Sequence, residues 1–143
     1  MTTIDPHRQT SSGAGALNAG LWAAQVLVAV TFVGGGLWKL VTPISQVAET
    51  FPWAGEVSSG VLYVSAVFDI LGGLGVLLPS VTRIKPRLTV LAALGCVALQ
   101  GSAIVFHVAR GEGADTGVNV AFLALAAFIA WGRWSMRPIG ARD

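Results

Sequence analysis

Four long apolar stretches dominate this sequence and limit the folds that it can adopt. Each is close to the roughly 20 residues that a helix needs to cross the hydrocarbon core of a bilayer. Of the 143 residues, 54% are hydrophobic and only 11% are charged, which is more apolar than a soluble domain of this size can bury. The sequence therefore predicts an all-α, integral membrane four-helix bundle. The predicted spans are residues 19–41, 60–78, 88–107 and 118–134.

The four spans form one domain and leave little sequence for any other. Residues 1–18 are rich in small and polar residues and are predicted to be a disordered tail, and residues 135–143 a short C-terminal tail. The first apolar stretch has full span length and no small-residue cleavage site after it, so we interpret it as an uncleaved helix and not as a secretory signal. The loop at residues 42–58 is apolar enough to lie on the membrane, either as an anchor or as a lid.

Basic residues are distributed unevenly between the two sides of such a bundle. Four spans place both termini and the second loop on one side, and the excess of basic residues there predicts that both termini are cytoplasmic. We interpret the basic clusters as orientation signals and expect no nucleic-acid partner. The first side holds Arg8, Arg83, Lys85, Arg87, Arg133, Arg137 and Arg142, and the other side holds Lys39 and Arg110 together with Glu49, Glu56, Glu112 and Asp115.

Cysteine and histidine are too sparse to indicate metal or thiol chemistry. Cys96 is alone, so one chain can form neither an internal disulfide nor a Cys-x-x-Cys redox pair. His7 and His107 lie a hundred residues apart in sequence with no thiolate beside them. The sequence therefore predicts no metal site and no intrinsic cofactor.

Asp69 is the least expected residue, because it interrupts the second apolar stretch. An acid at the depth of a bilayer costs about 2.5 to 3.5 kcal/mol on insertion scales and is seldom present without a partner or a function. At 100° per residue, Ser65 shares its helical face, and Gln100 and His107 share one face of the third span. Such small and polar faces turn inward in a membrane bundle.

Sequence position converts to depth at 1.5 Å per residue. Lys39, His107 and Asn119 then lie within one or two turns of the outer surface, and Asp69 and Gln100 lie about 15 Å down. These depths predict an outward-opening pocket with the two deeper residues as its floor and the other three as its rim. The candidate catalytic residues are Asp69 and His107, and the candidate ligand-binding residues are Lys39, Gln100, Asn119 and Ser65.

Each candidate also has a purely structural interpretation. Asp69 would clasp two helices by bonding a polar neighbour such as Gln100, Ser65 or Lys39. Lys39 near a helix end would snorkel to the interface, His107 would bond a backbone carbonyl, and Asn119 would cap the fourth helix. The glycine run at residues 34–36 lies inside a span, which favours a close helix crossing or a kink over a phosphate loop.

Short motifs follow one another along the membrane part in a characteristic order. They are Trp22 and Gln25; Gly36, Trp38, Lys39, Leu40 and Pro43; Asp69-Ile70-Leu71-Gly72-Gly73; Leu77-Leu78-Pro79; Leu88-Thr89-Val90-Leu91-Ala92-Ala93; His107; Asn119; and Gly132-Arg133. In order and spacing they resemble the DoxX-like family of small bacterial membrane proteins, over about residues 20–134. The family pattern has Glu more often than Asp at the second-helix acid.

The resemblance implies a multi-pass protein of the bacterial inner membrane and a link to quinones or to redox partners. Named members of the family include a small subunit of a thiosulfate:quinone oxidoreductase and membrane components of oxidative-stress complexes. The leading hypothesis is a small subunit in the lipid bilayer that binds a lipophilic ligand, such as a quinone, and supports a membrane-protein partner or a homo-oligomer. Two alternatives are an enzyme acting on a lipid or terpenoid, with Asp69 as general acid and His107 as its partner, and a purely structural assembly subunit.

Overall fold

Only helices and turns are found in the computed structural model, which describes residues 6–142. Because it has no strand within those residues, the predicted all-α class is confirmed. Its helices are α1 (Pro6–Val41), α2 (Ile44–Thr50), α3 (Trp53–Glu56), α4 (Ser59–Thr82), α5 (Arg87–Ala109), the 3-10 turn η1 (Gly113–Thr116), α6 (Gly117–Trp131) and the π-helical turn η2 (Gly132–Met136).

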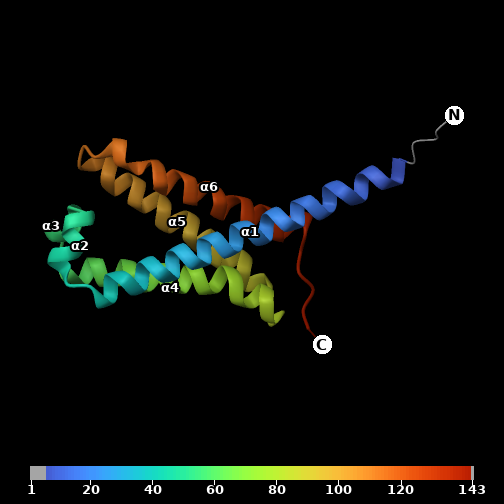
Figure 1. Ribbon diagram of the computed structural model, residues 1–143, viewed down its shortest axis with the longest axis horizontal. Coiled ribbons are helices and arrows are strands. Elements are labelled where there is room, and N and C mark those ends of the chain that lie inside the picture. Colours follow the sequence, from blue (N-terminus) through green and yellow to red (C-terminus); the bar gives the residue numbers. More distant parts are fainter. Residues whose placement is uncertain (1–5, 143) are drawn as a thin grey trace.

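Four long helices form the bundle, and they match the four predicted spans. The segments Gly13–Val41, Ser59–Thr82, Arg87–Ala109 and Gly113–Met136 are long and apolar enough to cross a membrane. α1 packs against α4, α4 against α5, α5 against α6, and α6 against α1 (Figure 1). Large apolar side chains remain on the outside, such as Leu91 at 65% and Val105 at 69% exposure. A bundle with an apolar exterior is the arrangement that hydrocarbon surroundings favour.

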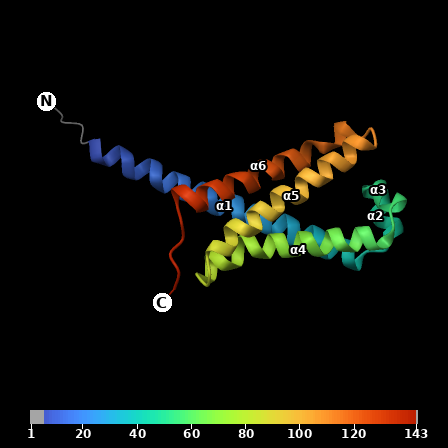
Figure 2. The same cartoon turned by 180° about the vertical axis from the view of Figure 1, so that it is seen from behind.

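The two ends of the bundle differ. The short helices α2 and α3 lie together at one end, opposite both termini, as Figures 1 and 2 show from two sides. We call the segment from Ile44 to Glu56 the cap, this end the cap end, and the opposite end the termini end. The cap packs on the bundle through a small apolar cluster around Val47, Ala54 and Leu62. The segment that was expected to be a surface anchor or lid is thus mostly helical and is seated on the bundle.

Residues 6–18, which the sequence analysis assigned to a tail, are helical in the structure and form the start of α1. Proline is well suited to the first position of a helix, where Pro6 stands. Ala14, Ala16 and Leu17 favour helix, and no later proline interrupts the segment. The start of α1 therefore extends beyond the other helices (Figure 1). Residues 1–5 of the predicted tail lie outside the described residues.

α4 also continues farther than the predicted span, which ended at Leu78. Pro79 lies inside the helix, which ends at Thr82. An internal proline removes one backbone hydrogen bond, and membrane helices tolerate this where side chains bond the carbonyls nearby. Here the Gln25 side-chain amide donates to the Val76 carbonyl over 2.6 Å, within one turn of the proline.

The predicted close crossing at the glycine run is confirmed, and a single glycine makes it. A Cβ added to Gly36 would lie 2.6 Å from the backbone oxygen of Ala66 and 2.7 Å from the Ile70 side chain. The same addition at Gly34 or Gly35 meets nothing within 4 Å. Gly36 therefore allows α1 to approach the α4 backbone closely, beside Asp69.

We expect Gly36→Ala to destabilise the protein by about 1–3 kcal/mol, the usual cost of overpacking. The Ala66 oxygen belongs to the α4 backbone and cannot move aside as a flexible side chain would. Gly35→Ala is the matched control, and it should be neutral or stabilising by up to about 1 kcal/mol, because alanine is the better helix former. Unfolding in mixed detergent micelles measures both variants, and equal stabilities would contradict this account of the crossing.

Candidate functional site

Asp69 is paired directly with Lys39. The Lys39 ammonium donates to Asp69 Oδ2 over 2.7 Å and joins α1 to α4. Both side chains are largely covered, at 16% and 14% exposure. Asp69 lies ten residues into α4, which corresponds to a depth of about 15 Å. Lys39, near the end of α1, therefore turns its charge inward instead of snorkelling to the surface.

Gln100 and Asn119 form a second polar pair at the cap-end half of the bundle, between α5 and α6. The Asn119 amide donates to Gln100 Oε1 over 2.8 Å, and Gln100 is buried. α6 begins at Gly117 with Thr116 as its N-cap residue. The interpretation of Asn119 as a helix cap is therefore wrong, because its side chain bonds another helix. The Ser65 hydroxyl bonds only within its own helix, where it donates to the Leu62 carbonyl.

His107 takes part in a chain of charged groups that ties α5 to the cap. Its Nδ1 lies 2.8 Å from Glu112 Oε2, so the partner is a carboxylate and not the backbone carbonyl of the structural interpretation. Arg110 donates through Nε to Glu112 over 3.0 Å and through Nη2 to Glu56 of α3. The hydrogen bond with His107, helped by Arg110, lowers the pKa of Glu112 against the opposing effect of desolvation. The bond with Glu56 is the main cause that raises the pKa of Arg110.

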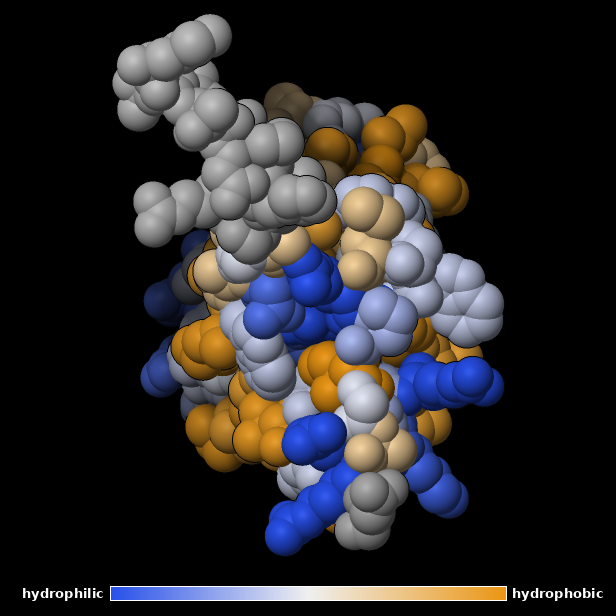
Figure 3. Space-filling view, turned by 90° about the vertical axis from the view of Figure 1, so that its right-hand side faces the viewer, coloured by the Kyte–Doolittle hydropathy of each residue, from blue (hydrophilic) through white to orange (hydrophobic). Residues whose placement is uncertain are grey.

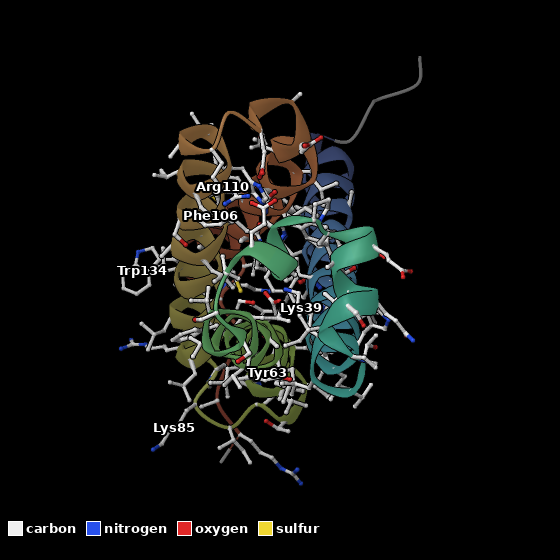
Figure 4. The ribbon with its side chains drawn as sticks, turned by 90° about the vertical axis from the view of Figure 1, so that its left-hand side faces the viewer. Lys39, Tyr63, Lys85, Phe106, Arg110 and Trp134 are labelled. Carbon is white, nitrogen blue, oxygen red and sulfur yellow. The ribbon has the colours of Figure 1, made fainter. Side chains whose placement is uncertain are left out.

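Trp53 of the cap packs beside both Lys39 and His107. The Lys39 ammonium lies 5.9 Å from the centroid of the Trp53 ring, a cation–π distance. The His107 ring lies edge-to-face at 6.3 Å from the same centroid, and Phe106 does so at 6.0 Å. Viewed from the cap end, Lys39 lies in the middle of the bundle, whereas Lys85 and Trp134 point away from it (Figure 4).

The predicted floor and rim residues are thus joined in pairs instead of being separated by an open pocket. Lys39 reaches Asp69, and Asn119 reaches Gln100. Asp69 and His107, the predicted catalytic pair, are each bonded to a different partner. Within the described part of the chain, no group of three or more His, Cys, Asp or Glu side chains is placed to hold a metal ion.

Sequence reasoning missed the partners contributed by the cap and by the loop after α5. Trp53, Glu56 and Glu112 entered the sequence analysis only as loop residues or surface charges. Glu112 lies only five residues after His107, just beyond the end of α5. This short spacing is a weak indication in the sequence that the two side chains are close. Nothing in the sequence pointed to the pairing of Glu56 with Arg110, because 54 residues separate them.

The sequence model of the DoxX-like family matches residues 23–129, which is most of the chain. This chain belongs to the DoxX-like family. The matched region contains Lys39, Asp69, Gln100, His107 and Asn119 and parts of all four long helices. Family membership and the four apolar helices together identify a multi-pass membrane protein. Comparisons with curated proteins and with solved structures gave no match.

The ion pair between Lys39 and Asp69 should show strong energetic coupling. We expect Lys39→Met and Asp69→Asn each to destabilise this DoxX-like protein, because each leaves one polar group unpaired inside the bundle. The double variant should lose less than the sum of the two, with a coupling of about 1–3 kcal/mol. Unfolding in mixed micelles measures the four corners of the cycle.

The pair of Arg110 with Glu56 is the control for this cycle, since the Glu56 side chain is 58% exposed. Water screens an exposed pair, so its cycle should give the smaller coupling. Additive effects for Lys39 and Asp69 would show that the pair does not fasten α1 to α4.

Acid should loosen the cap through Glu112. Its folded-state pKa is lowered, so its contribution to stability is complete above the ordinary glutamate pKa of about 4.3 and is lost as the pH falls through the lowered value. Hydrogen exchange of residues 44–56, corrected for intrinsic rates, should therefore accelerate below about pH 4.3.

Glu112→Gln should accelerate that exchange at neutral pH as well, because the neutral amide binds Arg110 more weakly. Glu49→Gln, an exposed change within the cap, should exchange like the unaltered protein. Unchanged exchange in Glu112→Gln at pH 7 would exclude Glu112 as the group that holds the cap.

Proposed function

We propose that this protein is a small subunit of the bacterial inner membrane that binds a quinone beneath the cap and supports a redox or stress-related partner protein. Both termini would lie in the cytoplasm, as the excess of basic residues at the termini end favours. The observation that carries the proposal is the placement of the Trp53 ring beside Lys39 and His107. A flat aromatic ring thus already lies within reach of a cation and an imidazole.

A quinone ring in the place of Trp53 would find suitable partners for its oxygens. Lys39 supplies positive charge and hydrogen-bond donors, and Asp69 holds it in position over 2.7 Å. His107 Nδ1 faces Glu112, an arrangement that orients the imidazole and would leave Nε2 for the ligand. A bound quinone would supply the electron chemistry. The residues of this chain would bind it, orient it and exchange protons with its oxygens.

Access to this site would require the cap to move. α3 is fastened by the contact of Glu56 with Arg110, by the packing of Trp53 against Phe106 and His107, and by a small apolar cluster around Ala54. These contacts are few, which is typical of segments that open locally. An apolar groove of about 220 Å³ lies between α1 and α4, lined by residues that include Val33 and Gly73, and it would accept a lipophilic tail. Gly73 is one helical turn along α4 from Asp69.

The two alternatives from the sequence fit this geometry differently. Acid–base catalysis by Asp69 and His107 together needs both groups at one reacting atom, and each is instead bonded to its own partner. A purely structural role is favoured by one observation, which is that the Lys39–Asp69 pair joins α1 to α4. The experiment must therefore separate ligand binding from assembly.

Photolabelling with a photoreactive quinone analogue tests the proposal in reconstituted protein. We expect labelling of peptides around Trp53 and His107. Lys39→Met and His107→Ala should each weaken labelling about tenfold, because each removes one charged or strong hydrogen bond to the ligand. Ser102→Ala is the control, since Ser102 is exposed on α5 and bonds only the Leu99 carbonyl. Native mass spectrometry of the extracted protein would identify a quinone that co-purifies.

Two further variants separate the remaining hypotheses. If Asp69→Asn and His107→Ala fold and keep full labelling, the quinone proposal is wrong. If Asp69→Leu abolishes expression while Asp69→Asn keeps both expression and labelling, the polar faces serve assembly alone. Thermal unfolding of each variant confirms that lost labelling is not lost folding.

A further inference from the structure

A second polar cluster lies at the termini end, and Arg133 is its centre. The Arg133 side chain is 5% exposed. Its Nε donates to Gln25 over 2.7 Å, and its Nη1 donates to Asn18 over 2.9 Å and to the Arg137 carbonyl over 3.2 Å. Its guanidinium carbon lies 4.9 Å from the centroid of the Trp22 ring. Three hydrogen bonds and the Trp22 ring therefore hold this guanidinium in one place.

The charge of Arg133 is nevertheless left uncompensated. Each acceptor that it bonds is a neutral amide or carbonyl, and among the described residues no carboxylate lies within ion-pair distance of it. Its Nη2 is buried and has no hydrogen-bond partner. A buried cation without a counter-ion is unfavourable, and a buried N–H without an acceptor adds to that cost. An anion beside Arg133 would offset both costs.

A cavity of about 320 Å³ adjoins Arg133, a volume within the range of ligand sites. Its polar walls are Ser80, Arg87 and Arg133, and its apolar walls include Val90, Trp134 and Ile139. The Ser80 hydroxyl makes hydrogen bonds of 2.8 Å with both Gln25 and Thr89. These bonds hold the Ser80 side chain in a fixed position in the cavity wall. Figure 3 looks onto the termini end and shows a hydrophilic patch in the middle of that face, with further hydrophilic side chains at its edges and apolar surface between them.

The surrounding charge also favours an anion. Among the described residues, all the charged side chains at the termini end are basic. They are Arg83, Lys85, Arg87, Arg133, Arg137 and Arg142. The acids whose side chains are described lie in α4 near its middle or at the cap end. Arginine is the residue best suited to phosphate, because its planar fork donates two parallel hydrogen bonds.

We propose that this cavity is a phosphate-binding site in which Arg133 and Arg87 hold the phosphate group of an anionic lipid. The apolar walls and the position at the end of the membrane-spanning helices favour a lipid over a free ion, since basic pockets of this kind between transmembrane helices bind lipid head groups. The acyl chains would run along the outer faces of α5 and α6. The site lies at the opposite end from the proposed quinone site and does not depend on it.

Thermal unfolding of the full chain in nanodiscs tests the site. Phosphatidylglycerol added to phosphatidylcholine nanodiscs should raise the unfolding temperature, because a ligand of the folded state stabilises it. Arg133→Gln should lower the apparent affinity about tenfold and Arg87→Gln by about fivefold. Lys85→Gln is the control, because it removes an equal charge from the same end outside the cavity, and it should change the affinity by less than about twofold at moderate ionic strength.

A second arm identifies the source of the phosphate. Inorganic phosphate is compared with chloride at equal ionic strength in phosphatidylcholine nanodiscs. Stabilisation by phosphate that Arg133→Gln and Arg87→Gln abolish would support the site with a free phosphate as its ligand, and stabilisation by phosphatidylglycerol alone would support the lipid. The absence of both effects overturns the site, as do equal losses in Arg87→Gln and Lys85→Gln. Arg87→Gln carries the test if Arg133→Gln does not fold.

Discussion

Polar groups inside a bilayer have no water to bond, so they must find hydrogen-bond partners within the protein. This requirement determines how the polar side chains of the bundle are arranged. Several polar side chains at depth take their hydrogen-bond partner from another helix. Asp69 meets Lys39, Gln100 meets Asn119, and Gln25 meets Ser80. Because lipid tails are as apolar as leucine, such bonds and close packing replace the hydrophobic effect as the attraction between helices. The polar pairs therefore help to fix which helices are neighbours, and Gly36 and Gly73 allow α1 and α4 to approach each other closely.

The cap is also held by polar contacts, but it lies at the end of the bundle, where water is near. There, water screens an ion pair and each pair contributes less to stability. α3 is held by a charged contact to Arg110 and by a small apolar cluster, whereas the long helices bury continuous faces against one another. The cap is consequently attached to the bundle by fewer contacts than the long helices make with one another. Its Trp53 ring lies beside Lys39 and His107, so the cap contacts two of the polar residues at this end of the bundle.

Local patterns in the sequence predicted the four spans, the helical class and the inward faces, because hydropathy and the helical repeat depend on neighbouring residues. The Asp69 partner was narrowed to three candidates and proved to be Lys39. The helical start at residues 6–18 was not expected from its small and polar residues, which helices tolerate when nothing breaks them. The contact of Glu56 with Arg110 was not predictable, since it joins residues from different elements that only the folded bundle brings together. The charge of Arg133 is evident from the sequence, but its burial depends on the folded bundle.

The burial of Arg133 matters because the two ends of the bundle differ in whether their buried cations have carboxylate partners. At the cap end, the described cations Lys39 and Arg110 both have carboxylate partners, and the acids outnumber them. At the termini end, Arg133 is enclosed by neutral acceptors, and the charged residues around it are basic. The compensated cations of the cap end leave an uncharged ligand with polar edges as the better match for the proposed quinone site. The uncompensated Arg133 would favour an anion at the termini end. The two proposed sites would therefore differ in the charge of the ligand that each selects.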